Sequence, residues 1–228
     1  MYDRHFIITG GAGGLGVSVV EEALSKGARV TVPHLGEEGL DRLTERLGEP
    51  ETLALVEADL TQEDQVATVF SEPHDGLIHL MGGFTMQPLH ETELDAFRAH
   101  IELQLTGTFL CCKHALRHMR KTGYGRIVTV GSKAIDTPMG QMGAYAAGKA
   151  AVVALTRTIA EEAKNLPDVT ANAVLPSVID TPANRAAMGD EQADAWVSPA
   201  HLAETICFLA SEAARDLRGA VLPVYGKV

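Results

Sequence analysis

The sequence predicts an α/β protein built on a doubly wound parallel sheet of about seven strands, with helices on both faces. Three observations predict this fold class. Short apolar runs alternate with longer amphipathic stretches along the 228 residues. A glycine-rich loop follows the first apolar run, and no internal repeat or linker interrupts the pattern. Parallel strands need crossover connections, which helices supply, so this alternation favours a parallel sheet.

Seven apolar runs have the length and composition of strands. The first, HFIIT, ends in glycines, which is typical of a buried strand that leads into a turn. We expect the second strand to stop at Pro33, because proline lacks the N–H group that a ladder needs. The predicted strands cover residues 5–9, 28–33, 52–60, 76–84, 125–132, 168–176 and 219–226.

The stretches between these runs are expected to be helices, with local signals at several ends. Gly27 closes the first helix, and Thr61 is expected to be the N-cap of the third. Thr92 with Asp95 resembles a capping pair at the start of a long helix. The predicted helices cover residues 15–27, 39–48, 61–72, 92–121, 143–165 and 201–211.

Residues 180–198 are the least regular part of the chain. They follow a strand end, where open α/β sheets bind ligands. We interpret them as a short flap over a site, within a single domain of residues 1–228. Met188 and Trp196 in this segment either line an apolar substrate pocket or pack the flap itself.

Composition argues against several classes of function. The formal net charge is −11 and no basic run is present, which argues against nucleic acid as a partner. No apolar run approaches the ~20 residues of a membrane span, and the first residues are too charged for a signal peptide. Three cysteines make no disulfide framework, so we expect reduced thiols in a cytoplasmic protein. Cys111, His114 and His118 lie near one helix face without a fourth ligand, and we expect no metal site.

The loop TGGAGGLG, residues 9–16, lies between the first predicted strand and the first predicted helix. Glycines there allow a tight turn and a close approach to a pyrophosphate, while the helix N-terminus offers free N–H groups. The spacing of Gly10, Gly14 and Gly16 differs from the commoner G-x-G-x-x-G, but the position is where a dinucleotide fingerprint belongs. No Lys-Ser/Thr pair closes the loop, so it is not a P-loop.

Tyr145 and Lys149 are the large polar side chains in the small-residue stretch GAYAAGKAA. Positions four apart share one helix face, so the phenol and the ammonium are expected side by side. A nearby cation favours the phenolate and lowers a phenol pKa by about 1–3 units. Tyr145 would then serve as a proton donor and acceptor near neutral pH. Ser132 lies just after the strand GRIVTV, thirteen residues before Tyr145, and can donate to a substrate oxygen.

In their order along the chain, these motifs resemble the short-chain dehydrogenase/reductase family. The resemblance rests on TGGAGGLG, on Asp59 in EADL, on Ser132, on Tyr145 and Lys149 in YAAGK, and on VLPSVIDTP. It extends from residue 5 to about residue 226. It implies a Rossmann-type fold, a nicotinamide cofactor, and hydride transfer between that cofactor and a carbonyl or alcohol.

The same resemblance assigns roles to single residues. Tyr145 would be the catalytic acid/base, Lys149 would lower its pKa and hold the nicotinamide ribose, and Ser132 would hydrogen-bond the substrate carbonyl. Gln104 stands where the family has an Asn that helps anchor a proton-relay water, and it is the fourth catalytic candidate. The expected cofactor-binding residues are Gly10, Gly13, Gly14, Leu15, Gly16, His34, Asp59, Leu60, Gly82, Tyr145, Lys149, Ile179 and Thr181.

The chain departs from the family pattern at four places. Gln104 replaces the Asn, LMGG (residues 80–83) replaces N-N-A-G, and Ser177 replaces the Gly after Pro176. The second strand ends in VPHLGEE, which has neither the Asp typical of NAD-preferring members nor the Arg or Lys typical of NADP-preferring ones. We favour NADP over NAD, because the carboxylate that would repel its phosphate is missing. His34 either hydrogen-bonds that phosphate or is an incidental loop histidine.

Three functions are compatible with these residues. The first is an NAD(P)-dependent oxidoreductase acting on a small ketone or secondary alcohol, with a 3-oxoacyl thioester as one candidate. The second is a dihydropteridine reductase-like enzyme, and the third a dinucleotide-binding sensor with little turnover. The intact Ser132, Tyr145 and Lys149 favour an enzyme.

In the resembled family, the helix at 92–121 and the Tyr–Lys helix build the dimer interface, so we expect a homodimer or homotetramer. The remaining histidines, His79 and His100 among them, are expected to be structural or solvated.

Overall fold

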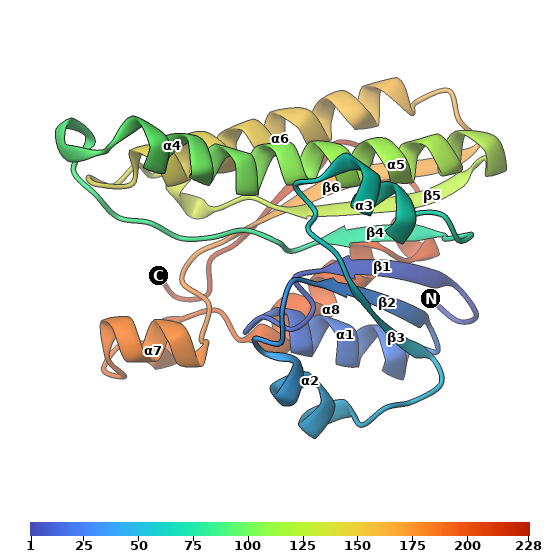
Figure 1. Cartoon of the computed structure of the whole chain (residues 1–228), viewed down its shortest axis with the longest axis horizontal. Coiled ribbons are helices and arrows are strands. Elements are labelled where there is room, and N and C mark those ends of the chain that lie inside the picture. Colours follow the sequence, from blue (N-terminus) through green and yellow to red (C-terminus); the bar gives the residue numbers. More distant parts are fainter.

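Parallel strands form one sheet in the computed structural model, which describes residues 1–228, and their order is β3-β2-β1-β4-β5-β6-β7 (Figure 1). The doubly wound fold predicted from the alternation is confirmed, with each strand at its expected place in the sequence. The strands are β1 (His5–Thr9), β2 (Arg29–His34), β3 (Leu53–Glu57), β4 (Gly76–His79), β5 (Tyr124–Val130), β6 (Asp168–Pro176) and β7 (Val221–Val224).

Helices cover both faces of the sheet. In Figure 1, α1, α2 and α8 lie on one face, and α3, α4, α5 and α6 lie on the other. The two faces bury separate cores, one around Ile8 and Ile206 and the other around Ile7 and Ile127. None of the helices combines the length and apolar character needed to cross a membrane. The helices are α1 (Gly16–Ser25), α2 (Leu40–Leu47), α3 (Glu63–Val69), α4 (Leu94–Ile101), α5 (Gly107–Thr122), α6 (Gly143–Glu162), α7 (Pro182–Met188) and α8 (Pro199–Leu209).

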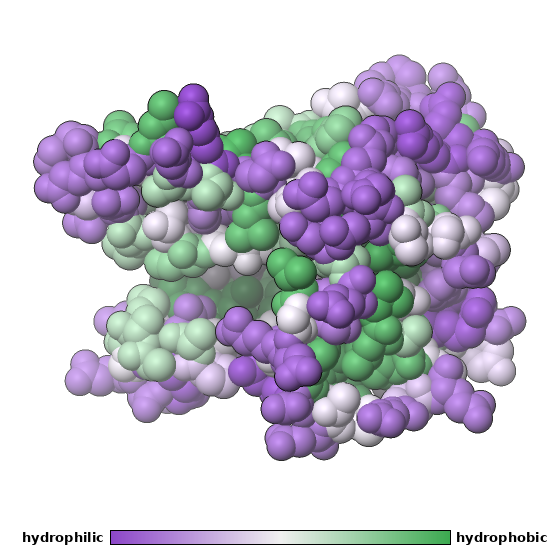
Figure 2. All heavy atoms as spheres, viewed as in Figure 1, coloured by the Kyte–Doolittle hydropathy of each residue, from purple (hydrophilic) through white to green (hydrophobic).

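The strand order reverses between β1 and β4, which pair from Phe6 with Gly76 to Thr9 with His79. The loops after these two strands diverge to opposite sides, so a crevice forms at the carboxyl edge of the sheet. Figure 2 shows the molecule hollowed there, between the end that carries α4 and the end that carries α7, with apolar residues in the recess. The candidate site is built around this crevice.

Strand β2 continues through Pro33 to His34, so the prediction that Pro33 ends it was wrong. Pro33 pairs in register with Val56 of β3. Backbone N–H groups alternate along β2, with Arg29 donating toward β1 and Val30 toward β3. Pro33 is on the β1 side of this alternation, and the β1–β2 register has already ended at Thr31. The missing N–H group therefore removes no ladder bond.

Neither predicted capping residue caps its helix. Thr61 donates its hydroxyl to Asp59 Oδ1 at 2.7 Å, and the N-cap of α3 is Gln62 without a side-chain bond. Thr92 donates to the Pro88 carbonyl at 3.0 Å, and α4 starts after Glu93. In both cases the hydroxyl donates to a nearby oxygen and accepts no helix N–H group, since local side-chain bonds of this kind are common for threonine.

The single long helix expected at 92–121 is interrupted. A π-helical segment, Glu102–Thr106, separates α4 from α5. Gln104 lies in this segment, and a π-helical turn often marks a functional site. The insertion shifts the helix face, so residues before and after it do not share the register of one α-helix.

Candidate active site

The loop between β1 and α1 can be built only with glycine at two positions. Gly10 has φ of +67°, and a Cβ there would lie 2.9 Å from the Met81 backbone nitrogen. A Cβ on Gly16 would lie 2.0 Å from the Gly10 carbonyl oxygen. The Gly13 N–H group donates to that same carbonyl at 3.0 Å and closes the turn. The loop is therefore pressed against the end of β4, at the switch point of the sheet.

The N-terminus of α1 is open to an anion. Its N-cap is Leu15, which gives no side-chain bond, and the first turn carries no acidic residue. Unpaired N–H groups and the helix dipole there favour a phosphate group. The close-packed glycine turn and the uncapped helix together fit the pyrophosphate of a dinucleotide.

The flap approaches this loop from the other end of the chain. A Cβ on Gly14 would lie 2.9 Å from Thr181 Cγ2, so Thr181 rests directly on the glycine turn. Thr181 Oγ1 caps α7 by accepting from the Asn184 N–H group at 3.3 Å. Ile179 pairs with Val197, which closes the base of the flap. The structure thus brings Thr181 to the glycine residues, as expected of residues that share a ligand.

His34 and Asp59 follow neighbouring strands at the same sheet edge. The Ala58 N–H group donates to the His34 carbonyl at 2.8 Å. The His34 ring contacts the Gly36 carbonyl at 2.8 Å through Nδ1. Asp59 Oδ1 accepts from the backbone and the hydroxyl of Thr61, and Leu60 is buried. The segment after His34 approaches the glycine loop, since a Cβ on Gly39 would lie 2.5 Å from the Ala12 carbonyl oxygen.

Tyr145 and Ser132 meet on the opposite wall of the crevice. Tyr145 is half-buried on α6, where its ring packs edge-on against Phe84 at 5.1 Å between centroids. Ser132 is buried directly after β5, and its Oγ accepts from the Ala134 N–H group at 3.2 Å. Burial raises the pKa of Tyr145, and the Ser132 hydroxyl opposes that rise as a hydrogen-bonding neighbour of the phenol.

Lys149 is buried, and its ammonium donates to the Val130 carbonyl at 2.9 Å. Burial lowers the pKa of Lys149 to about 8. We expected Lys149 to lower the pKa of Tyr145, but the structure gives the phenol a pKa above its ordinary value. The reason is geometric: the ammonium is directed to the β5 backbone, and burial of the phenol dominates. Lys149 also borders Gly82, where a Cβ would lie 3.2 Å from Nζ.

Gln104 is buried between α6 and the loop after β4. Its Nε2 donates to the Gly83 carbonyl at 3.2 Å and also contacts His100 Nε2. Gly148 of α6 lies against it, since a Cβ there would be 3.4 Å from Gln104 Cδ. Gln104 Oε1 is buried without a partner in the protein. The structure therefore places Gln104 against the turn of α6 that carries Tyr145 and Lys149, with one acceptor left free.

Two histidines that were expected to be structural or solvated lie beside these residues. His79 ends β4, is buried, and contacts Thr9 Oγ1 through Nδ1 at 2.9 Å. Burial, with a smaller effect of Lys149, lowers its pKa to about 3. His100 lies next to Tyr145, with ring centroids 6.2 Å apart. A usable signal existed for each: His79 directly precedes the LMGG loop, and His100 lies four residues before Gln104.

The two flap residues have different environments. Trp196 is buried, and Gly226 packs against its backbone, so it belongs to the packing of the flap. Met188 is 59% exposed at the end of α7. The alternative of flap packing therefore holds for Trp196, while Met188 is free to meet a ligand.

Comparison with known proteins gives a family match. The family model described as short chain dehydrogenase matches residues 4–192. Cis-4-hydroxycyclohexanecarboxylate dehydrogenase of Sinomonas cyclohexanicum is 36% identical over 240 residues, covering 98% of this chain and 96% of that protein. The 3-oxoacyl-(acyl-carrier-protein) reductase MabA of Mycobacterium tuberculosis is 33% identical over 241 residues, covering 98% and 92%.

Solved structures agree with the sequence match. A short-chain type dehydrogenase/reductase from Mycobacterium ulcerans superposes with a TM-score of 0.91 at 26% identity, covering 100% of this chain and 90% of that one. ElxO with NADP bound superposes with a TM-score of 0.90 at 27% identity, covering 98% of both chains.

Proposed function

Since the chain belongs to the short-chain dehydrogenase family and is an oxidoreductase, we propose that it transfers hydride between a nicotinamide dinucleotide and a ketone or secondary alcohol. The observation that carries this proposal is the meeting of Ser132, Tyr145 and Lys149 at the carboxyl edge of the sheet. Two hydroxyls and a buried ammonium there face the crevice that begins at the glycine loop. A plain dinucleotide-binding module has no need for that arrangement.

The proposed chemistry follows from these side chains. When a carbonyl is reduced, negative charge develops on its oxygen, and the hydroxyls of Ser132 and Tyr145 are placed to donate to it. Tyr145 gives up its proton as the alcohol forms. Although burial dominates the pKa of the resting phenol, the Lys149 charge would stabilise the phenolate once it forms, because an opposite charge favours the ionised form. In the oxidation direction the same groups act in reverse.

We propose that the dinucleotide lies along the crevice. Bound there, the nicotinamide ring supplies or accepts the hydride. The pyrophosphate would be held at the glycine turn and the α1 N-terminus, and the adenine beside Asp59 and Leu60. The ribose next to the nicotinamide would be held by Lys149 and Tyr145, since the Lys149 ammonium keeps N–H groups beyond the one given to Val130. Ile179 and Thr181 would contact the nicotinamide carboxamide. Gly82 leaves room beside Lys149 Nζ.

We favour NADP over NAD for this chain. Strand β2 ends in His34 and the loop Leu35–Gly36, with no carboxylate at the strand end to repel a 2′-phosphate. His34 has one ring nitrogen on the Gly36 carbonyl and the other free of protein partners, so it can reach a phosphate. ElxO, a structural relative, has NADP bound.

The substrate is proposed to be a largely apolar carbonyl compound, with 3-oxoacyl derivatives as the leading candidates. Several apolar side chains are exposed on segments around the crevice: Phe84, Met86, Leu89, Met139 and Met188. Arg185 on the flap is held by the carboxylates of Asp180 and Asp190, so it is not free to bind an anionic substrate. The curated relative MabA is a 3-oxoacyl reductase.

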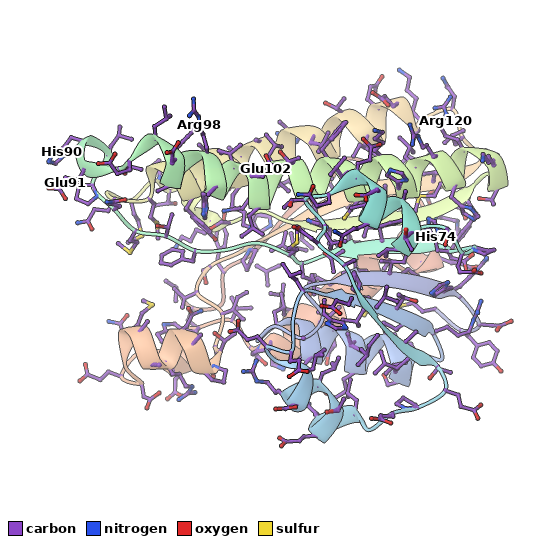
Figure 3. The ribbon with its side chains drawn as sticks, in the orientation of Figure 1. His74, His90, Glu91, Arg98, Glu102 and Arg120 are labelled. Atoms are coloured by element: carbon purple, nitrogen blue, oxygen red, sulfur yellow. The ribbon has the colours of Figure 1, made fainter.

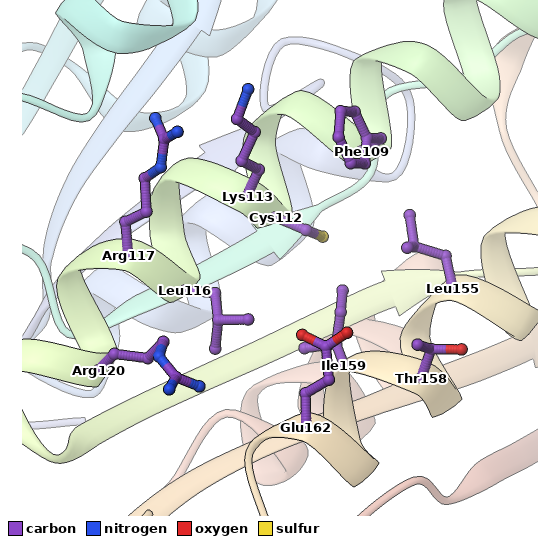
Figure 4. Close-up of a pocket in the computed structure, with 10 residues that line it drawn as sticks. All are labelled: Phe109, Cys112, Lys113, Leu116, Arg117, Arg120, Leu155, Thr158, Ile159 and Glu162. Carbon is purple, nitrogen blue, oxygen red and sulfur yellow. The ribbon is translucent and has the colours of Figure 1, made fainter.

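We propose that α5 and α6 form the contact in a homodimer or homotetramer. A groove of about 270 Å³ runs between these helices (Figure 4). Phe109, Leu116 and Leu155 give it an apolar floor, and Phe109 is 46% exposed. Arg117 and Arg120 border it on α5 and Glu162 on α6, so a second copy in the opposite orientation would pair these charges. We also propose a cytoplasmic location, where the three buried free thiols would stay reduced.

A variant of Tyr145 tests the proposed function. Wild type, Tyr145→Phe and the surface control Tyr2→Phe would be titrated with NADPH and NADH by nicotinamide fluorescence and then offered ketones. We expect all three to bind the dinucleotide and only Tyr145→Phe to lose turnover, by at least about 100-fold. Unchanged turnover in Tyr145→Phe would remove the phenol from the mechanism. Binding without turnover of any ketone or pterin would favour a sensor.

A further inference from the structure

His100 occupies an unusual place for a histidine outside the proposed catalytic group. It lies near the end of α4, two residues before the π-helical segment begins at Glu102. Its ring lies beside Tyr145, and its Cε1 is 4.0 Å from the Cβ position of Gly83. His100 thus faces the same part of the crevice as the phenol.

The contacts of Gln104 determine which nitrogen of His100 carries the proton. The Gly83 carbonyl can only accept, so the amide nitrogen of Gln104 must face it. The same nitrogen contacts His100 Nε2. His100 Nε2 must then be the acceptor, and in a neutral ring the proton resides on Nδ1. Burial, with a smaller effect of the Lys149 charge, lowers the pKa of His100 and keeps the ring neutral at pH 7.

The protonated nitrogen is available to a ligand. His100 Nδ1 has no hydrogen-bond partner in the protein and is not fully buried, in contrast to Gln104 Oε1. It is therefore a neutral donor with some solvent exposure, on a ring that lies beside Tyr145. Phe84, 60% exposed and in contact with Tyr145, gives the neighbouring wall an apolar surface.

We propose that the Nδ1–H group of His100 binds a second oxygen atom of the substrate while the reacting carbonyl lies at Ser132 and Tyr145. This inference rests on the proposed function. It narrows the substrate class to neutral carbonyl compounds that carry another oxygen acceptor close to the reacting carbon, such as 3-oxoesters and 3-oxothioesters. Gln104 is the positioning residue, since its amide holds the ring in the donating tautomer.

The first readout needs no turnover. In protein labelled with ¹⁵N on histidine, His100 is expected to show a protonated Nδ1 at pH 7, assigned with the His100→Phe variant. Addition of methyl 3-oxohexanoate is expected to shift this resonance, and addition of 4-octanone, which lacks the ester carbonyl, is not. An Nε2–H tautomer, or equal shifts with both compounds, would overturn the inference.

The second readout compares kcat/KM for the same two ketones. Their intrinsic reactivities differ, so the quantity of interest is how the ratio changes between protein variants. His100→Phe keeps an aromatic ring at this position but removes the N–H donor. The ratio of kcat/KM for the oxoester to kcat/KM for 4-octanone is expected to fall about three- to tenfold. His100→Asn places an amide near the position of Nδ1 and should retain the preference. His100→Gln places its amide near the position of Nε2 and should lose it.

A control comes from His90, an exposed histidine at the outer tip of the molecule next to Glu91 (Figure 3). His90→Phe should leave the ratio unchanged. If every variant reduces both ketones with the wild-type ratio, the His100 inference is wrong and the proposed function stands. If no ketone is reduced but methyl 3-oxohexanoate still shifts the His100 resonance, the proposed function is wrong and the binding role of His100 stands.

Discussion

Replacement of Lys149 by Met should make the protein more stable at neutral pH while it abolishes activity. Lys149 keeps its charge in a buried position, with one hydrogen bond, from Nζ to the Val130 carbonyl. Methionine has a similar length and no charge, so it removes the cost of burying the ammonium. The structure therefore predicts an opposite effect on stability and on function at one residue.

The magnitude follows from the pKa. Burial lowers the pKa of Lys149 from 10.5 to about 8. This corresponds to a cost of about 3 kcal/mol in the free energy of unfolding when the group is charged in both states. Loss of the hydrogen bond to Val130 costs about 1 kcal/mol. We therefore expect Lys149→Met to be about 2 kcal/mol more stable than wild type at pH 7.

The stability difference between wild type and Lys149→Met should depend on pH, and its direction follows from the pKa shift. The folded-state pKa lies below the unfolded-state value, so between about pH 8 and pH 10.5 the unfolded chain binds more protons. The free energy of unfolding of the wild type, as far as Lys149 determines it, therefore rises with pH across that window. Below the window the full cost of burying the ammonium remains. The Met variant lacks this contribution. The extra stability of the Met variant should therefore vanish as the pH rises. Above about pH 10 the wild type should be the more stable protein, because it alone has the hydrogen bond to Val130.

The assay is urea unfolding of both proteins at several pH values and one protein concentration. Other groups titrate in the same window, but they are common to both proteins, so the difference in unfolding free energy isolates Lys149. A difference that does not depend on pH would refute the reasoning, as would a Met variant that is less stable at pH 7.

Three further changes test other parts of the account. Gly16→Ala places a Cβ 2.0 Å from the Gly10 carbonyl oxygen and should weaken dinucleotide binding at least about tenfold in a fluorescence titration, whereas Gly140→Ala, with open space around it, should not. Arg126→Met, at a fully buried guanidinium that binds the Ser211 carbonyl and a carboxylate, should lower the free energy of unfolding in urea by about 2–4 kcal/mol, and an unchanged midpoint would contradict its structural role. Ser132→Ala should lower kcat about 100-fold with little change in dinucleotide affinity; equal losses in both would indicate a folding defect instead.

The sheet and the glycine loop could be predicted because their signals are local. A short apolar run can be recognised as a strand from the residues next to it in the sequence. The predicted bounds of β1 and β6 agree with the observed ones at both ends. The capping predictions at Thr61 and Thr92 failed for the opposite reason. Each hydroxyl could accept from a helix N–H group or donate to a nearby oxygen, and the sequence does not say which partner the backbone brings closer.

The candidate site was predicted only as a set of residues. The spacing of Tyr145 and Lys149 placed them on one helix face, but it could not show that the Lys149 ammonium would bond the β5 backbone. The direction of the Tyr145 pKa shift depends on burial by Phe84 and other residues far away in the sequence. The spacing of His100 four residues before Gln104 was a usable signal, but it could not show that the His100 ring would lie beside Tyr145.

The central claim is that this chain moves a hydride from a nicotinamide to a carbonyl carbon. The measurement that tests it most directly is a reaction of the wild-type protein with methyl 3-oxohexanoate and NADPH carrying two deuterium atoms at C4 of the nicotinamide, followed by mass spectrometry of the alcohol. We predict one deuterium in the product, bound to the carbinol carbon, and no such product with Tyr145→Phe. An alcohol without deuterium, or a labelled alcohol formed equally well by Tyr145→Phe, would contradict the account.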